Sequence, residues 1–289
     1  MTVVNSLPEP SERMMSMKVS RSHKSLVLAL ITASLFAACA KQTIGSKGGD
    51  TIGTYSANEA KLYLRNSNSP GDADIIFSYG PSGQTRLPIA GDWDGDGKDG
   101  VGLYDPLNGG WFLKNSNSDG VAEIMLSFGP PGRNLLAIAG DWDGDGKDSV
   151  GLYDPATAAW FLKNSNSPGE ADVIALSYGP SGRKLLPLAG DWDGDGKDTV
   201  GLYDPENGGW FLKNSNSNGV ADVMFSFGPS GENLLPIAGD WDGDGRDGVG
   251  LFDPQKGSWF LKSSNSNGDA DMTFTFGATN AKPLVGRWK

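Results

Sequence analysis

The chain has 289 residues with 42 glycines and 17 prolines, and no long amphipathic helix pattern follows residue 50, so we expect short strands joined by tight turns. Its formal net charge of -11 argues against nucleic acid and anionic lipid as partners of the folded body. The only histidine and the only cysteine are His23 and Cys39. Residues 50–289 therefore cannot form a Ser-His-Asp triad, a cysteine nucleophile, a zinc site of His and Cys, or a disulfide.

The first element in chain order is a short apolar segment behind basic residues. Lys18, Arg21 and Lys24 precede the apolar stretch 26–38. This stretch is too short to span a bilayer and has the length of the apolar region of a signal peptide.

Small residues followed by Cys39 resemble a bacterial lipobox, which implies that the cysteine is lipidated and becomes the first residue of the mature chain. We therefore interpret 1–38 as a lipoprotein signal peptide, with a true start between Met14 and Met17, and 39–50 as a tether. The alternative is an ordinary secretory signal with an incidental cysteine. No second cysteine is present to pair with it, which favours lipidation.

A repeat fills the rest of the chain. The hexapeptide Asp-Trp-Asp-Gly-Asp-Gly occurs four times, and its starts are 49, 50 and 49 residues apart. The copies occupy 92–97, 141–146, 191–196 and 240–245. A period near 50 is typical of a propeller blade made of four short strands.

One repeat unit shows four strand patterns. The first strand, 87–93, has small residues in its middle, which suits the crowded axis of a propeller. The second strand is expected at 101–104, the third at 111–114 and the fourth at 122–128. In the fourth strand apolar and polar residues alternate, which predicts one buried and one exposed face.

The strand patterns occur five times, with a circular offset. The chain begins the repeat at the second strand, 51–55, and the missing first strand is found at 283–288. The C-terminal strand should therefore complete the first blade, which removes a free edge. The predicted fold is all-β, a five-bladed β-propeller of four-stranded blades over 51–289.

The hexapeptide also indicates a metal site. Three carboxylates on alternate residues followed by glycine are typical of a calcium loop, with oxygen ligands at positions 1, 3 and 5. The alternative is an Asx-rich turn without metal, in which the clustered carboxylates repel one another. The candidate ligands are Asp92, Asp94 and Asp96; Asp141, Asp143 and Asp145; Asp191, Asp193 and Asp195; and Asp240, Asp242 and Asp244.

The longer phrase Gly-Asp-Trp-Asp-Gly-Asp-Gly-Lys-Asp-x-Val-Gly-Leu-Tyr-Asp-Pro resembles the FG-GAP/VCBS repeats, which form calcium-binding β-propellers such as the head of integrin α subunits. The resemblance covers about residues 50–289 and implies about four structural Ca²⁺ ions. It also implies a backbone carbonyl ligand at position seven, from Lys98, Lys147, Lys197 and Arg246.

This sequence departs from the family pattern in its closing carboxylate. The family places it at position nine, whereas here the aspartate falls at position eight, at Asp99, Asp148, Asp198 and Asp247. Either the loop takes another route and these four also ligate, or water completes the shell. The first blade has lost the loop, with 43–49 in its place.

Two further repeated features have alternative interpretations. Tryptophans begin the third strands, either as sugar-stacking platforms or, as we favour, as the core between blades. They are Trp111, Trp160, Trp210 and Trp259. Asn-Ser-Asn-Ser loops either recognise a polar ligand or, as we favour, are solvated hairpin loops. They begin at Asn66, Asn115, Asn164 and Asn214.

The most obvious carboxylates recur in every blade, whereas a catalytic pair should be singular, so we do not expect an enzyme. The expected function is a calcium-stabilised binding or adhesion module on an exported bacterial lipoprotein, at the outer membrane or cell surface, that recognises glycans through repeated sites. The alternative is a scaffold that docks a protein or peptide in the central channel. The expected molecule is a monomer that meets the membrane only through its lipid.

Overall fold

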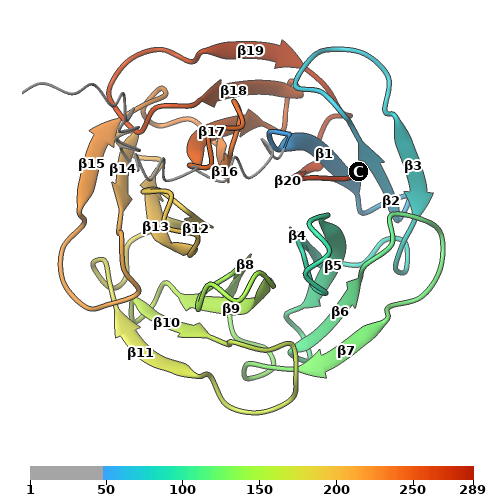
Figure 1. The fold of residues 1–289 in the computed structure, drawn as a ribbon, viewed down its shortest axis with the longest axis horizontal. Helices are drawn as coiled ribbons and strands as arrows, with labels where there is room; N and C mark the ends of the chain where they lie inside the picture. Colours follow the sequence, from blue (N-terminus) through green and yellow to red (C-terminus); the bar gives the residue numbers. More distant parts are fainter. Residues whose placement is uncertain (1–47) are drawn as a thin grey trace, which may run out of the picture. The chain divides into compact units, whose positions relative to one another are not determined.

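The computed structural model describes residues 48–289, which form a ring of five four-stranded antiparallel sheets (Figure 1). The predicted five-bladed β-propeller is confirmed. The predicted signal peptide, Cys39 and residues 39–47 of the predicted tether lie outside the described residues. The described part contains no helix long and apolar enough to cross a membrane.

Each blade runs from an inner strand at the axis to an outer strand at the rim. Blade 1 contains β20 (Lys282–Gly286), β1 (Thr51–Ser56), β2 (Lys61–Leu64) and β3 (Ile75–Ser78). Blade 2 contains β4 (Leu87–Gly91), β5 (Gly100–Asp105), β6 (Gly110–Lys114) and β7 (Ile124–Ser127). Blade 3 contains β8 (Leu136–Gly140), β9 (Ser149–Asp154), β10 (Ala159–Leu162) and β11 (Val173–Ser177). Blade 4 contains β12 (Leu186–Gly190), β13 (Thr199–Asp204), β14 (Gly209–Leu212) and β15 (Val223–Ser226). Blade 5 contains β16 (Leu235–Gly239), β17 (Gly248–Asp253), β18 (Ser258–Lys262) and β19 (Met272–Thr275).

Blade 1 is assembled from both ends of the repeat region, as the circular offset predicts. Strand β20 pairs with β1 in antiparallel register from Thr51↔Gly286 to Tyr55↔Lys282. The C-terminal strand therefore supplies the inner strand of the blade that the N-terminal part begins. This seam closes the ring without a covalent link.

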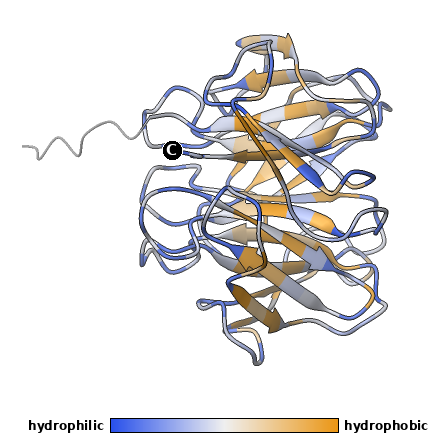
Figure 2. Ribbon diagram, turned by 90° about the vertical axis from the view of Figure 1, so that its right-hand side faces the viewer, coloured by the Kyte–Doolittle hydropathy of each residue, from blue (hydrophilic) through white to orange (hydrophobic). Residues whose placement is uncertain are grey.

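Burial changes from the middle of a blade to its rim. Every residue of β5, β9, β13 and β17 is buried, because blades pack against both faces of these strands. In the outer strand β7, Leu126 is buried while Met125 is exposed, as the alternating pattern predicts. Hydrophobic residues accordingly concentrate on the strands and hydrophilic residues on the loops (Figure 2).

The hydrophobic core lies between successive blades. Tyr104 and Trp111 of blade 2 pack in one cluster with Val150 and Leu152 of blade 3. The Trp111 indole donates a hydrogen bond to the carbonyl of Phe128 over 3.0 Å. The four third-strand tryptophans are fully buried, so the core interpretation is confirmed and none of them can be a surface platform for sugars: Trp111, Trp160, Trp210 and Trp259.

Blade 3 contains one more residue than the other blades with a hexapeptide loop. Strand β11 has five residues where the other outer strands have four, and its pairing with β10 shifts register between Trp160 and Phe161. This β-bulge explains why one of the repeat spacings is 50 residues and not 49.

Candidate functional site

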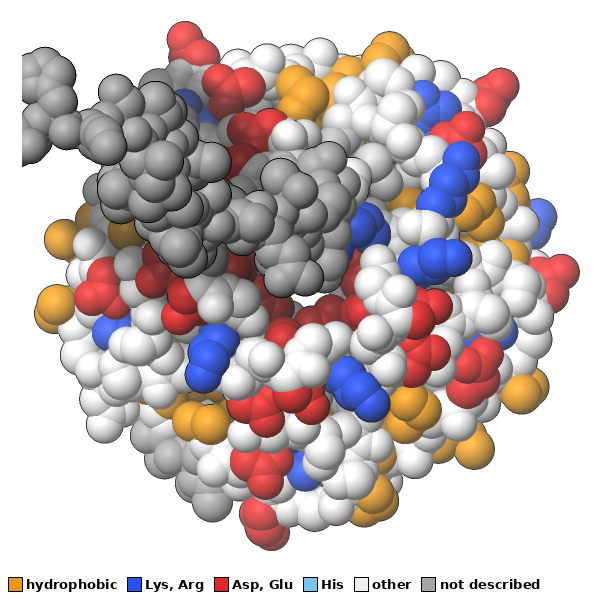
Figure 3. Space-filling view, viewed as in Figure 1, with side chains coloured by type: hydrophobic (Ala, Val, Ile, Leu, Met, Phe, Trp, Pro, Cys, Tyr) orange, Lys and Arg blue, Asp and Glu red, His pale blue; other side chains and the backbone are white. Residues whose placement is uncertain are grey.

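The loops that carry the hexapeptides meet around the central opening on one face of the ring. Acidic side chains gather around this opening (Figure 3). A cavity of about 700 Å³ lies there, lined by loop aspartates from every blade and by Arg287. We call this cavity the channel mouth; all five blades contribute carboxylates to it.

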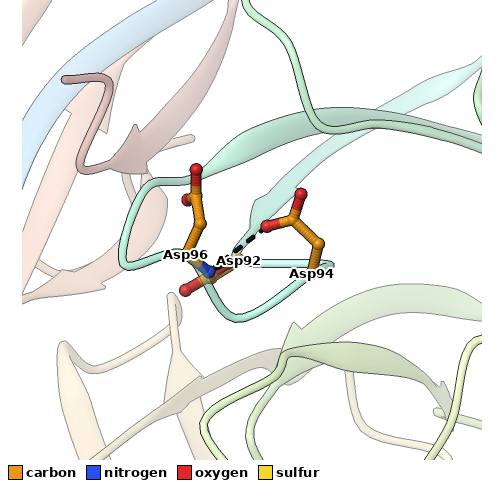
Figure 4. Close-up of side chains that lie close together, drawn as sticks. All are labelled: Asp92, Asp94 and Asp96. Carbon is orange, nitrogen blue, oxygen red and sulfur yellow. Dashed lines mark hydrogen bonds between the residues drawn. The ribbon is translucent and has the colours of Figure 1, made fainter.

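Each hexapeptide brings three carboxylates together. Oxygens of Asp92, Asp94 and Asp96 lie within 4.8 Å of one another in the connection between β4 and β5 (Figure 4). The other three hexapeptides form the same grouping: Asp141, Asp143 and Asp145; Asp191, Asp193 and Asp195; Asp240, Asp242 and Asp244.

The first aspartate shapes the loop. Asp92 Oδ1 accepts hydrogen bonds from the backbone N–H groups of Gly95 and Asp96, at 2.8 and 3.1 Å, and Oδ2 accepts one from Gly97 at 2.7 Å. Gly95 and Gly97 have φ angles of 82° and 85°, a region that favours glycine. The chain therefore turns sharply around this carboxylate and directs the next two outward.

These oxygens fit a hard divalent cation. Asp94 and Asp96 are exposed, and carboxylate oxygens retain lone pairs beyond those that accept backbone hydrogen bonds. Burial raises the pKa of Asp141, and repulsion from Asp145 acts in the same direction. A bound cation would relieve that repulsion, so the donor set suits calcium.

The aspartates at position eight do not join these groups. Asp148 Oδ2 instead accepts a hydrogen bond from the backbone N–H of Asp92 over 2.7 Å, and the Asp148 N–H donates to the Asp92 carbonyl over 2.8 Å. This pair of bonds links blade 3 to blade 2. Asp198 makes the same two bonds with Asp141, and Asp247 makes them with Asp191.

Two residues that the sequence analysis did not single out complete this ring of junctions. Asp50, which we assigned to the tether, accepts from the Asp240 N–H at 2.9 Å and donates its own N–H to the Asp240 carbonyl. Arg287 takes the place of the first aspartate in blade 1, and its N–H donates to Asp99. Its Nε lies 3.3 Å from Asp50 Oδ1. The signal was present, since Asp50 precedes β1 as Asp198 precedes β13.

The channel mouth disfavours negative charge. Burial raises the pKa of Asp148 to about 6. Burial also raises the pKa of Asp99, Asp198 and Asp247, and neighbouring carboxylates add to each shift. The four junctions that these aspartates make therefore combine good hydrogen bonds with unfavourable charge crowding.

The Asn-Ser-Asn-Ser loops are held from inside by their second asparagine. Asn166 Nδ2 donates to the Asp148 carbonyl over 2.8 Å, and its Oδ1 accepts from the Val150 N–H over 3.2 Å. The same amide-to-carbonyl bond recurs from Asn68, Asn117, Asn216 and Asn265. The first asparagine, as at Asn164, is exposed. These contacts support the structural interpretation of the loops.

A buried lysine side chain stabilises the same loops. The Lys163 side chain is buried, donates from Nζ to the Glu170 carbonyl over 2.9 Å, and lies 5.6 Å from the centre of the Phe128 ring in the preceding blade. Lys213 repeats this arrangement with the carbonyl of Val220 and the ring of Tyr178. The polar loop is thereby tied to the neighbouring blade.

Grooves lie at the rim side of three successive blade junctions. The groove between blades 2 and 3 encloses about 390 Å³ and is lined by Phe161, Leu152 and Leu135, with Arg133 and Asp154 paired at 3.6 Å. Equivalent grooves of about 420 and 430 Å³ lie between blades 3 and 4 and between blades 4 and 5. Each groove is lined by a phenylalanine on one side and by polar groups beside it.

Comparison with known proteins leaves the family open. No protein family matches the chain, and no curated protein matches its sequence. The resemblance to FG-GAP/VCBS repeats therefore stays a prediction. Among solved structures, a lectin from Agrocybe aegerita that recognises non-reducing terminal N-acetylglucosamine is 12% identical, covering 80% of this chain and 77% of that chain with a TM-score of 0.39. That superposition is too weak to transfer site residues or a ligand.

Proposed function

We propose that residues 48–289 form a calcium-stabilised, non-enzymatic binding module that recognises glycans through equivalent grooves at the blade junctions. The observation that carries this proposal is the repetition of one amphipathic groove at three successive junctions. Small-molecule sites are mostly apolar clefts with a few placed polar groups.

The groove chemistry suits a sugar ring. The phenylalanine wall, Phe161, Phe211 or Phe260, presents an apolar face to the C–H groups of a pyranose. In the groove between blades 2 and 3, Arg133 and Asp154 supply hydrogen-bond donors and acceptors for hydroxyl groups. Single grooves of this size would bind weakly, and several on one ring would give avidity toward a repetitive glycan.

Calcium has a structural role in this proposal. An ion in each hexapeptide loop would neutralise three clustered carboxylates and fix the turn between the first and second strands of its blade. The carboxylates recur in four blades, which suits a repeated structural site better than a single catalytic pair. We therefore propose that the protein is not an enzyme.

The proposed setting is a bacterial surface. A lipid on Cys39 would anchor an exported monomer to the outer membrane or cell surface, with the propeller facing its ligands. This part rests on the sequence pattern alone.

A glycan array tests the binding function. We expect the calcium-loaded protein to bind a subset of immobilised glycans, and the double variant Phe161→Ala/Phe211→Ala to lose most of that signal. The matched control is Met125→Ala, at an exposed outer-strand residue that lines none of the three grooves. Melting curves establish that each variant is folded. Absence of binding to every glycan class would contradict the proposal.

The second candidate is a scaffold that docks a protein or peptide in the central channel. One observation favours it, the cavity of about 700 Å³ at the channel mouth with its acidic lining. A partner for this site would be basic. Capture of a lysine- and arginine-rich peptide that is abolished by Asp247→Asn, with no glycan bound, would favour it over the glycan proposal.

A further inference from the structure

One position of the connecting segment is an arginine at the junction between blades 1 and 2 and a leucine at each of the next three junctions. Arg86 stands where the following junctions carry Leu135, Leu185 and Leu234. The three leucines are buried, with at most 4% of their surface exposed. All four positions directly precede an inner strand, so their side chains enter equivalent places.

The Arg86 side chain covers the aromatic wall of its own junction. Its guanidinium carbon lies 4.4 Å from the centre of the Phe112 ring, and its Nε lies 3.5 Å from Asp105 Oδ2. Only 16% of the side chain is exposed. Phe112 and Asp105 correspond to Phe161 and Asp154, which line the groove at the next junction. The arginine thus holds the two groups that a ligand would use.

In the open junctions the charged partner comes from elsewhere and stays at the rim. Arg133 pairs with Asp154 and Arg183 with Asp204, and each arginine lies two residues before the equivalent leucine. Their side chains are 57% and 44% exposed, so they border the grooves without filling them. Phe161 and Phe211 remain part of the groove lining.

The seam junction lacks the same lining. Between blades 5 and 1, Thr54 and Tyr63 replace the leucine and phenylalanine that line the other grooves. Thr54 lies against Gly277, where the other junctions place a leucine against the glycine.

We propose that Arg86 is a built-in occupant that closes the groove between blades 1 and 2, so that neutral pyranose rings bind at three consecutive junctions only: blades 2 and 3, 3 and 4, and 4 and 5. This inference rests on the proposed glycan function. A sugar entering the first junction would have to displace a largely buried guanidinium from both an aromatic face and a carboxylate. The near-identical repeats therefore present an arc of sites on one side of the ring.

The test uses two opposite substitutions and a defined set of probes. Crystals of the calcium-loaded protein are soaked with methyl glycosides of glucose, galactose, mannose, N-acetylglucosamine and N-acetylgalactosamine, and calorimetry counts the sites for any that binds. Wild type should show sugar at three junctions and none beside Phe112. Arg86→Leu, which installs the residue of the other junctions, should add a fourth site. Leu135→Arg should remove the site between blades 2 and 3.

The outcomes separate this inference from the proposed function. Sugar beside Phe112 in wild type, or an unchanged site count in folded Arg86→Leu, would overturn the role of Arg86 while leaving glycan binding intact. Sugar bound only at the channel mouth would overturn the groove assignment. If no glycoside bound anywhere, both this inference and the glycan proposal would be wrong. Arg86→Leu decides the question even if Leu135→Arg does not fold, because leucine already fits three equivalent sites.

Discussion

The position-eight aspartates combine two opposing effects in one side chain. Asp148 accepts the Asp92 N–H over 2.7 Å, which satisfies a backbone donor across the blade junction. The same carboxyl lies in the crowded channel mouth, where burial raises its pKa to about 6. Its hydrogen bond therefore stabilises the ring while its charge destabilises it at neutral pH.

Asp148→Asn separates the two effects. Asparagine keeps an oxygen for the Asp92 N–H and removes the charge. Because the pKa rises by about two units and one unit corresponds to about 1.4 kcal/mol, we expect a gain in unfolding free energy of at most about 3 kcal/mol at pH 7 in chelator. Asp148→Ala removes both effects and should be about 1 kcal/mol less stable than the asparagine variant. Urea denaturation of the two variants measures this difference, and equal stability would refute a role for the hydrogen bond.

A second prediction concerns the asparagine that holds the same junction. Asn166→Ala leaves the Asp148 carbonyl and the Val150 N–H without their partner, so we expect a loss of roughly 1–3 kcal/mol in unfolding free energy. Asn164→Ala, two residues earlier at an exposed position, should change stability by less than about 0.5 kcal/mol. The same urea experiment compares them. A reversed order would mean that the first asparagine holds the loop.

At the scale of elements, the three carboxylates of the hexapeptide loop have different structural roles. Asp92 receives three backbone hydrogen bonds and builds the turn, while Asp94 and Asp96 stay exposed. Substitutions at the two exposed positions therefore report on a cation more cleanly than substitutions at Asp92.

The calcium prediction follows from these roles. We expect calorimetry to count about four Ca²⁺ ions, and the melting temperature to rise with calcium relative to chelator, because a ligand of the native state stabilises it by mass action. Asp94→Asn/Asp96→Asn should remove one ion and leave stability in chelator nearly unchanged. Magnesium should substitute poorly, since it demands a tight octahedron. A melting curve that is the same in chelator and in millimolar calcium would refute structural calcium.

The repeat pattern predicted the strands and blades, but it did not predict the contacts between them. Period and alternation predicted five blades, the buried tryptophans and the exposed Met125, because these depend on local sequence. The bond from Asp92 to Asp148 joins residues 56 apart, and spacing alone cannot show which carboxylate faces the next blade. Asp50 was placed in the tether for the same reason. The role of Arg86 depends on a stacking geometry that only the folded junction creates.

At the scale of the whole molecule, the seam decides whether the ring stays closed. Strand β20 pairs with β1 over five residue pairs, and Arg287 adds contacts to Asp99 and Asp50. Deleting 283–289 should therefore destabilise the entire domain and expose the edge of β1.

We expect the truncated protein to melt at a lower temperature and to form oligomers or aggregates, because similar blades can pair between molecules. Light scattering and size-exclusion chromatography measure this outcome. A control deletion of Lys289 alone, an exposed residue, should leave the protein monomeric. A monomeric, equally stable truncation would show that β20 does not close the ring.

The last prediction concerns anchoring, through a residue outside the described part of the chain. Cys39→Ser should release the protein from membranes in a folded, soluble form, because the acidic body offers no surface for anionic lipid. Fractionation and mass spectrometry of the mature N-terminus check this. An unmodified Cys39 in the wild type would replace the lipoprotein assignment with simple secretion.

At the seam, Arg287 replaces the first loop aspartate, and this replacement changes which part of the ring is least stable. In blades 3, 4 and 5 the first and eighth loop carboxylates repel each other, whereas in blade 1 the corresponding pair, Arg287 and Asp50, attracts. Chain termini usually fray first. Here, as calcium is withdrawn, we expect the covalently continuous blades to loosen earlier than the place where the two ends meet. The weakest points of the ring would then lie within the chain, in blades 3, 4 and 5, and not at the seam.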